Sequence, residues 1–339
     1  MTMHAASVTD VSTILGEIER SNTAAMEENQ TGPCVVTLNL VVYVDDPGYS
    51  DWVLERAGRV ADKHPSRLIV LDATRSDGGA DVATGVHRGS GCTVLTQRVD
   101  LAIAGVEPRV VASLVDDLAI AGTHTVLWWS SAKITGAPLL EALLPLVGTL
   151  VVDSSGAARG EEAVGAIAAF LEQHPSVAVY DFAYMRLAPW REMIAQFFDD
   201  PSLFDDLFSL RKLEIAAGSE AEIVYLAGWL GSRLSWQVRD SGTFVARDGH
   251  EVPFKRTLVG DRRRVSSVTL RSTDSTYTAA LSEDASVVRL SVEGSNAKPA
   301  WYTPLQRVDN TSLLESSTIS EGPDQIFEVT IETVRALLG

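Results

Sequence analysis

The chain has 339 residues, of which 45% are hydrophobic and 22% charged, and its formal net charge is −17 with a pI near 4.7. This composition is ordinary for a soluble globular protein, and the length favours two domains over one. The negative charge argues against a general nucleic-acid binder or anionic-membrane binder, because phosphates would be repelled.

The first residues lack a basic stretch followed by an apolar run, so no secretory signal is expected. The most apolar stretch, residues 138–152, contains a glutamate, a proline and a glycine and is too short to span a bilayer. Cys34 and Cys92 each stand at the entrance of an apolar run, which favours buried free thiols over a redox pair. We therefore expect a cytoplasmic protein.

Helical and strand patterns alternate along the first half of the chain, which predicts a mostly parallel, Rossmann-like sheet with helices on both faces. The glycine-rich stretch 73–91 matches neither GxxxxGK[ST] nor GxGxxG, so we expect a long surface connection there, followed by a strand near a sheet edge. The expected order is helix 8–28, strand 35–44, helix 51–64, strand 67–73, strand 92–104, helix 108–121, strand 125–131, helix 138–146, strand 148–154, helix 160–173 and strand 180–183.

After residue 180 the pattern changes. Apolar side chains from Trp190 to Phe198 recur at helical spacing, and Pro189 suits the first turn of that helix. Helices are expected over 203–210, 221–234 and 324–338, and the short alternating runs of 235–302 predict an antiparallel meander. We therefore predict two domains, an α/β Rossmann-like domain over 1–180 and an α+β domain over 181–339.

Signatures of catalysis are scarce. The chain has no GxSxG elbow, Walker loop or CxxC, and its six histidines show no HxxxH or HExxH spacing. His64, His124 and His174 stand at expected helix ends, where the helix dipole favours them. We expect no catalytic residue, no metal and no cofactor. Residues 153–160 follow a strand and precede a helix, where ligands of such folds often bind, although an ordinary turn also explains them.

Basic and aromatic residues cluster in two places. The segment from Arg239 to Arg271 holds eight basic and four acidic residues, a local excess of +4; it either protects a sheet edge or meets an acidic partner or a sugar phosphate. Trp128 and Trp129 are adjacent on one strand and must face opposite sides. Arginine and tryptophan dominate interface hot spots, which makes the following residues candidates for partner contacts: Arg186, Trp190, Arg191, Arg233, Arg262, Arg263 and Arg264.

Three stretches in this order carry a resemblance to a known family: TVLWWSS, DFAYMRLAPWREMIAQFFD and EIVYLAGWLGSRLSW. The core D-x-x-x-x-R-L-x-P-W-R spans Asp181 to Arg191, and GWL-x-SRL-x-W spans Gly228 to Trp236. The chain resembles the OpcA family, the glucose-6-phosphate dehydrogenase assembly proteins of bacteria. The resemblance covers most of the chain.

The resemblance implies a non-catalytic role: assembly and positive allosteric control of glucose-6-phosphate dehydrogenase, which feeds the oxidative pentose phosphate pathway and supplies NADPH. The dehydrogenase would be the partner, with no nucleic acid and no membrane involved. The alternative is an α/β enzyme or sensor that binds a sugar phosphate or nucleotide near residues 153–160. Thiol control through Cys34 or Cys92 stays open.

Overall fold

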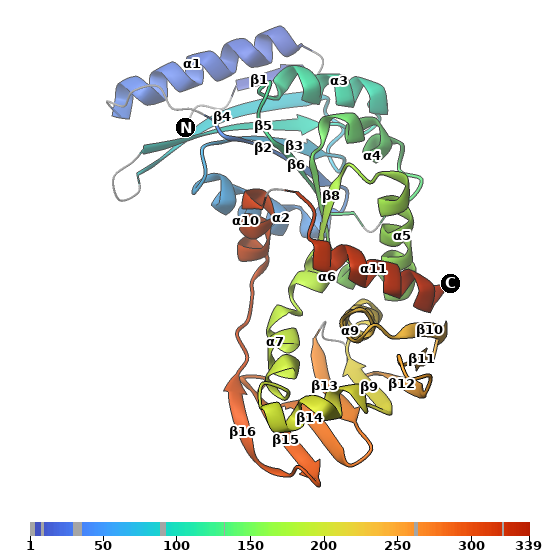
Figure 1. The fold of residues 1–339 in the computed structure, drawn as a ribbon. Helices are drawn as coiled ribbons and strands as arrows, with labels where there is room; N and C mark the ends of the chain where they lie inside the picture. The colour runs from blue at the N-terminus through green and yellow to red at the C-terminus, as the bar shows by residue number, and fades with distance from the viewer. Residues whose placement is uncertain are drawn as a thin grey trace. The chain divides into compact units, whose positions relative to one another are not determined.

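The computed structural model describes residues 4–7, 10–29, 36–88, 93–131, 133–260, 264–320 and 322–339. Within these ranges the chain forms two compact units, which interleave along the sequence (Figure 1). The first unit comprises Met1–Val152, His174–Tyr180 and Asp309–Gly322; the second comprises Asp153–Gln173, Asp181–Val308 and Pro323–Gly339. Each unit is built on one eight-stranded sheet.

The sheet of the first unit has the strand order β1-β4-β5-β3-β2-β6-β7-β8. From β5 to β7 the neighbours pair in parallel, whereas β4 pairs antiparallel with β5, and β1 antiparallel with β4. The central strands are mostly apolar and buried, as expected for a sheet that helices cover on both faces. The strands are β1 His4–Ser7, β2 Leu38–Val44, β3 Ser66–Asp72, β4 Gly79–Arg88, β5 Thr93–Ala102, β6 Thr125–Trp129, β7 Thr149–Val152 and β8 Ala178–Asp181.

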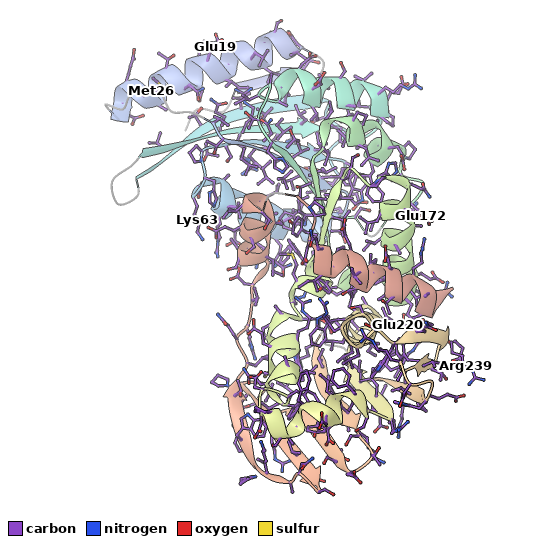
Figure 2. All side chains as sticks on the ribbon, in the orientation of Figure 1. Glu19, Met26, Lys63, Glu172, Glu220 and Arg239 are labelled. Atoms are coloured by element: carbon purple, nitrogen blue, oxygen red, sulfur yellow. The ribbon has the colours of Figure 1, made fainter. Side chains whose placement is uncertain are left out.

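Helices α1, α3 and α4 lie on one face of this sheet, and α2 and α10 lie on the other (Figure 1). Proline at the first turn starts α2, α3 and α4, where its missing N–H costs nothing. Lys63, just after α2, pairs with Glu315 of α10 at 2.6 Å (Figure 2). The helices are α1 Val11–Asn29, α2 Pro47–Ala61, α3 Pro108–Leu118, α4 Pro138–Leu143 with the 3-10 turn η1 Leu144–Leu146, and α10 Asn310–Ile319.

The two adjacent tryptophans of β6 confirm the prediction of opposite faces. The ring of Trp129 stacks on Tyr43 of β2 with centroids 3.9 Å apart, and its Nε1 donates to the Lys133 carbonyl at 2.8 Å. Trp128 instead lies 6.2 Å from Trp52 of α2, centroid to centroid. Both indoles are buried, so they contribute to core packing on the two faces of the sheet.

The sheet of the second unit has the order β10-β11-β12-β9-β13-β14-β15-β16. Neighbouring strands pair antiparallel except β12 with β9, so the predicted antiparallel strands are confirmed. Strand β9, which precedes them in the chain, lies between β12 and β13. The strands are β9 Lys212–Ala217, β10 Gln237–Asp240, β11 Thr243–Val245, β12 Glu251–Leu258, β13 Val265–Arg271, β14 Ser275–Leu281, β15 Val287–Gly294 and β16 Lys298–Pro304.

Helix α9 packs on β9 and β12, and α5 and α11 pack on α9 (Figure 1). The approach of α9 to α11 is close: a Cβ on Gly228 would lie 2.3 Å from Val334 Cγ2. Only glycine fits there without a shift of α11. The helices are η2 Ser154–Gly156, α5 Gly160–Gln173, α6 Phe182–Met185, α7 Ala188–Gln196, η3 Pro201–Leu203, α8 Phe204–Phe208, α9 Glu220–Leu234 and α11 Gln325–Leu338.

The predicted α/β fold class is confirmed, with two corrections to the first sheet. The stretch 73–91 is not only a connection, because β4 occupies Gly79–Arg88 within it. The strand 93–102 is not near the edge either, since β4 and β1 lie beyond it. Cys34 and Cys92 fall outside the described residues. Among the residues that the structure does describe, no helix is both long and apolar enough to cross a bilayer.

Candidate functional site

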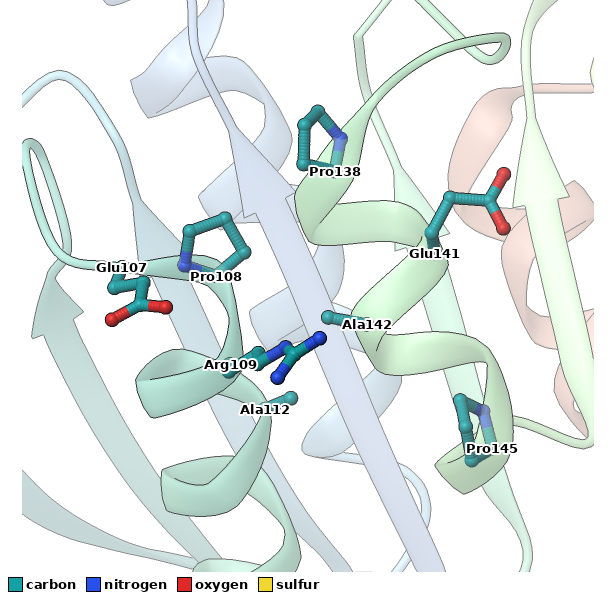
Figure 3. Close-up of a pocket in the computed structure, with 8 residues that line it drawn as sticks. All are labelled: Glu107, Pro108, Arg109, Ala112, Pro138, Glu141, Ala142 and Pro145. Carbon is teal, nitrogen blue, oxygen red and sulfur yellow. The ribbon is translucent and has the colours of Figure 1, made fainter.

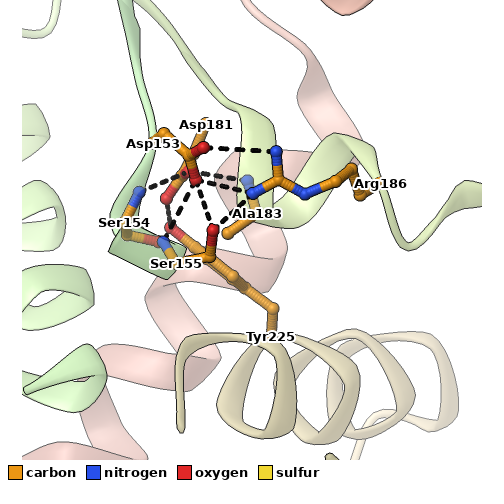
Figure 4. A network of polar contacts seen from close by, with 7 residues as sticks. All are labelled: Asp153, Ser154, Ser155, Asp181, Ala183, Arg186 and Tyr225. Atoms are coloured by element: carbon orange, nitrogen blue, oxygen red, sulfur yellow. Dashed lines mark hydrogen bonds and ion pairs between the residues drawn. The ribbon is translucent and has the colours of Figure 1, made fainter. Parts of the chain in front are cut away.

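The loop after β7 and the turn after β8 meet at Arg186 in the second unit (Figure 4). The guanidinium of Arg186 binds Asp153 in a two-point contact, Nη2 to Oδ1 at 2.6 Å and Nη1 to Oδ2 at 3.2 Å. It also donates to Ser155 Oγ. The side chains of Arg186 and Asp153 are 19% and 22% exposed, so this ion pair is largely withdrawn from water. Fork-to-carboxylate pairs of this kind are among the strongest polar contacts in proteins.

Asp181 lies beside this pair and is fully buried. Its Oδ1 accepts from the backbone N–H groups of Ala183 at 2.9 Å and Ser154 at 3.0 Å, and its Oδ2 accepts from the Tyr225 hydroxyl at 2.7 Å. Burial, and then the charge of Asp153, raise the pKa of Asp181. The carboxyl therefore caps α6 and fixes the loop after β7 to α9.

Burial alone would lower the pKa of the Arg186 guanidinium, but three nearby carboxylates raise it. Asp153, Asp181 and Glu222 together raise the pKa of Arg186 above its usual value. Glu222 stands on α9 and is buried like its neighbours on that helix. Arg186 is therefore a permanently charged residue whose charge is balanced inside the unit.

A cavity of about 330 Å³ opens beside this network, and Arg186 forms part of its wall. Its apolar floor is buried, whereas Gln306 and Arg307 at its mouth are exposed. Three arginines and one glutamate line it, a formal excess of +2 within a chain of −17. The lining residues are Arg186, Leu187, Trp190, Glu222, Arg264, Val265, Ala285, Leu305, Gln306, Arg307 and Val308.

One wall of the cavity has an uncommon backbone conformation. Ala285, in the turn between β14 and β15, has a φ of 56°, a region that L-residues other than glycine, asparagine and aspartate rarely occupy. Its N–H donates to the Ser282 carbonyl at 2.9 Å, and its own carbonyl accepts from Arg307 Nη2 at 3.3 Å. The strained turn thus positions Arg307 at the mouth of the cavity.

The structure brings three of the predicted contact residues together: Arg186, Trp190 and Arg264 line the same cavity. Trp190 is 3% exposed, so it belongs to the floor. Arg191 lies over the Tyr184 ring, 4.0 Å from its centroid, and donates to the Tyr184 carbonyl at 3.1 Å. Arg233 is exposed in the last turn of α9. Arg262 and Arg263 fall outside the described residues.

Other members of the basic segment pair with acids of the second unit. Arg239 on the edge strand β10 pairs with Glu251 of β12 (Figure 2). Arg256 pairs with Glu161 of α5. These two arginines are therefore engaged in ion pairs within the unit.

In the first unit, the carboxyl ends of β2 and β6 form the position where open α/β sheets commonly bind ligands. Asp46 Oδ1 accepts from the N–H of Gly48 at 2.8 Å and so caps α2. Asp45 accepts from the Ser131 hydroxyl at 2.6 Å. Two carboxylates stand where a phosphate would need backbone N–H groups, so this edge is unsuited to a dinucleotide.

A second cavity, of about 650 Å³, lies between α3 and α4 of the first unit (Figure 3). None of the predicted contact residues that the structure describes lines this cavity. Its lining holds two acids and one arginine, so its charge favours neither an anionic nor a cationic ligand strongly. Its lining is Glu107, Pro108, Arg109, Ala112, Pro138, Glu141, Ala142 and Pro145.

The described residues contain no group of three histidine, cysteine, aspartate or glutamate side chains that could hold a metal ion. Two of the histidines near helix ends contact carboxylates instead: His64 Nε2 lies 3.3 Å from Glu315, and His174 Nε2 lies 3.8 Å from Glu141.

Sequence reasoning missed Asp153, Tyr225, Glu222 and Arg307. Asp153 lies at the start of the stretch 153–160 that was singled out, but its partner is 33 residues away. Glu222 had a signal, because it directly precedes the uninterrupted apolar run 223–231 of α9. Arg307 had none, since it lies in an irregular segment outside helices and strands.

Two family models match the chain. One, described as the glucose-6-phosphate dehydrogenase subunit N-terminal domain, matches residues 57–169; the other, described as the C-terminal domain of that subunit, matches residues 177–331. A solved NAD-binding oxidoreductase from Klebsiella pneumoniae gives a TM-score of 0.44 at 10% identity, over 89% of this chain and 90% of that chain.

Curated relatives named OxPP cycle protein OpcA match about half of the chain. The Nostoc punctiforme protein is 24% identical over 189 residues, and the Synechococcus elongatus protein 25% over 187 residues. These matches cover 53% and 52% of this chain but only 40% and 41% of those proteins. The two family models match in chain order, and together they include every residue of the Arg186 network drawn in Figure 4. The chain belongs to the OpcA family.

Proposed function

We propose that this protein is a non-catalytic assembly factor and positive allosteric effector of glucose-6-phosphate dehydrogenase, which supports the oxidative pentose phosphate pathway and the supply of NADPH. The observation that carries the proposal is the pair of family matches over 57–169 and 177–331, whose descriptions name a subunit of that dehydrogenase. The names of the curated relatives refer to the same pathway.

Two features of the chain support a role without catalysis. The charged groups of the Arg186 network are bound to one another, with Asp181 fully buried and holding three donors, so they are unsuited to proton transfer with a substrate. In the first unit, the side chain of Asp46 accepts a hydrogen bond from the backbone N–H of Gly48 at the start of α2. A dinucleotide phosphate would need such an N–H group at this position. Both arrangements stabilise structure.

The test is an assay of purified glucose-6-phosphate dehydrogenase from the same organism, with and without this protein. We expect higher activity or higher substrate affinity, together with a larger dehydrogenase oligomer by light scattering. An unchanged rate, substrate affinity and oligomer size at saturating amounts of this protein would refute the proposal.

We place the partner contact at arginines on the surface of the second unit. Arg233 is exposed and Arg264 is half-buried, whereas Arg186, Trp190 and Arg191 would support that surface from below. Arg233→Glu is expected to weaken co-elution with the dehydrogenase and to leave the melting temperature nearly unchanged, because an exposed charge contributes little stability. Arg159→Glu is the matched control, since Arg159 is also exposed on the second unit and its ion pair among the described residues is a local one, with Glu162. An equal effect of both reversals would mean that net charge, and not a contact, controls binding.

The alternative function is an α/β enzyme or sensor for a sugar phosphate or nucleotide. One observation favours the binding of such a phosphorylated ligand. Three arginines line one cavity of the second unit, beside the loop that begins at Asp153.

A further inference from the structure

The cavity beside Arg186 has arginines of two kinds. Arg186 is bound to Asp153 and Ser155, so its donors are engaged. Arg264 and Arg307, in contrast, form no ion pair with any carboxylate among the described residues, which exclude 261–263 and 321. Their two guanidinium groups therefore supply the charge that the cavity offers to a ligand.

The remaining lining dictates how a ligand would lie. Leu187, Trp190, Val265 and Ala285 are buried and form an apolar floor. Glu222 is buried in the same wall and would repel an anion that moved inward. The anionic group must therefore stay near the mouth, while an uncharged carbon body occupies the floor.

The guanidinium groups of Arg264 and Arg307 favour a phosphate over a carboxylate as the anionic group of the ligand. A guanidinium fork binds two oxygens at once, and a carboxylate has only two oxygens to offer. A phosphate monoester has three terminal oxygens and nearly two charges, so it can engage two arginines together. The volume of about 330 Å³ is near the lower limit of small-molecule sites, roughly 300–1,000 Å³, which favours a ligand smaller than a dinucleotide.

We propose that this cavity binds a small organic phosphate, with the phosphate held by Arg264 and Arg307 and the carbon body resting on the floor around Trp190. The strained turn at Ala285 is part of the site, because its carbonyl holds Arg307 in place. This inference goes beyond the proposed function: it gives the protein a metabolite site of its own, which is measurable without the dehydrogenase.

The experiment is calorimetric titration of the full chain alone, at constant ionic strength, with inorganic phosphate, a hexose 6-phosphate and malonate. We expect saturable binding of both phosphates, and at least tenfold tighter binding of the hexose phosphate, because its body covers the apolar floor. Absence of saturable binding by both phosphates would overturn the inference. Malonate binding as tightly as the hexose phosphate would overturn the choice of a phosphate ligand.

Two variants and one control assign binding to the cavity. Arg264→Gln and Arg307→Gln should each weaken hexose phosphate binding tenfold or more. Arg289→Gln, which removes an exposed arginine of β15 outside the lining, should leave it unchanged. Arg307 is exposed, so its variant is expected to fold, and far-UV circular dichroism verifies this. Equal binding by both variants and the wild type would place the ligand elsewhere and refute the site. Loss of phosphate binding with an intact effect on the dehydrogenase would separate this site from the proposed function.

Discussion

Arg186 offers the sharpest test of whether the residues of the family motif hold the protein together. We consider Arg186→Met, which keeps the length and apolar character of the side chain but removes its charge. The substitution deletes the hydrogen bonds to Asp153 and Ser155, and it removes the positive charge that Asp153, Asp181 and Glu222 face.

Removal of one partner of a buried ion pair typically costs about 3–5 kcal/mol, because the other charge stays buried. Arg186 and Asp153 are 19% and 22% exposed, so water recovers part of that cost. We therefore expect Arg186→Met to lower the free energy of unfolding by about 2–4 kcal/mol. Asp153→Asn should cost less, since Arg186 keeps the attraction of Asp181 and Glu222.

The measurement is urea denaturation followed by both tryptophan fluorescence and far-UV circular dichroism, for the two single variants and the double variant. Because the two groups touch, the double variant should be less destabilised than the sum of the single variants, with a coupling of about 1–3 kcal/mol. Arg159→Met is the control: this arginine is 75% exposed and should change stability by less than about 0.5 kcal/mol. A loss below about 1 kcal/mol for Arg186→Met, with additive effects, would show that the network contributes no net stability.

Three further predictions concern packing, backbone strain and protonation in the second unit. Gly228→Ala should destabilise the protein by about 1–2 kcal/mol, because its Cβ would strike Val334 in α11. Gly165→Ala in α5, whose Cβ would lie 3.9 Å from its nearest neighbour, should stabilise it by about 0.5–1 kcal/mol through helix propensity. Stabilisation by both substitutions in urea denaturation would contradict the close approach of α9 to α11. Ala285→Gly should stabilise by about 1 kcal/mol by relieving the positive φ, and a loss of stability in the same assay would show that the turn is unstrained. The pKa of Asp181 is raised on folding, so between the ordinary aspartate pKa and the raised value the folded state binds the proton more strongly than the unfolded state. Its contribution to stability is therefore full at low pH and falls as the pH rises through this window; carboxyl NMR titration of Asp181 at or below its ordinary pKa would exclude this dependence.

The sequence predicts those parts of the fold that depend on local pattern. The predicted helix 160–173 coincides with α5, because its apolar side chains repeat at helical spacing within clear ends. Strand β4 was missed because glycines interrupt it and its pairing with β5 supplies what its own sequence lacks. Helix α10 was missed because its serines and threonines conceal the apolar residues, Leu313 and Leu314, that it buries. In both cases tertiary contacts outweigh local preference.

The site was predictable only in part, for a related reason. The family motif directed attention to Arg186 and Trp190, and the basic segment to Arg264; the structure places all three on one cavity. The motif gave no indication that Asp153 would neutralise Arg186, because a long-range ion pair leaves no periodic pattern in the sequence. Arg307 was unpredictable because its position depends on the strained turn at Ala285.

The Arg186 network also bears on what the family motif encodes. Asp181 and Arg186 belong to the D-x-x-x-x-R core, and their partners Asp153 and Tyr225 come from the loop after β7 and from α9. A motif whose charged groups are bound to other parts of the same unit carries structural information, since these groups have little capacity left for a ligand. Selectivity toward a ligand or partner must then reside in residues that the motif positions but does not contain. Arg264 and Arg307 satisfy this condition, because they share the wall of the cavity with Arg186 but lie outside its network. Substitutions in the network should therefore change stability first, whereas substitutions of Arg264 and Arg307 should change binding first.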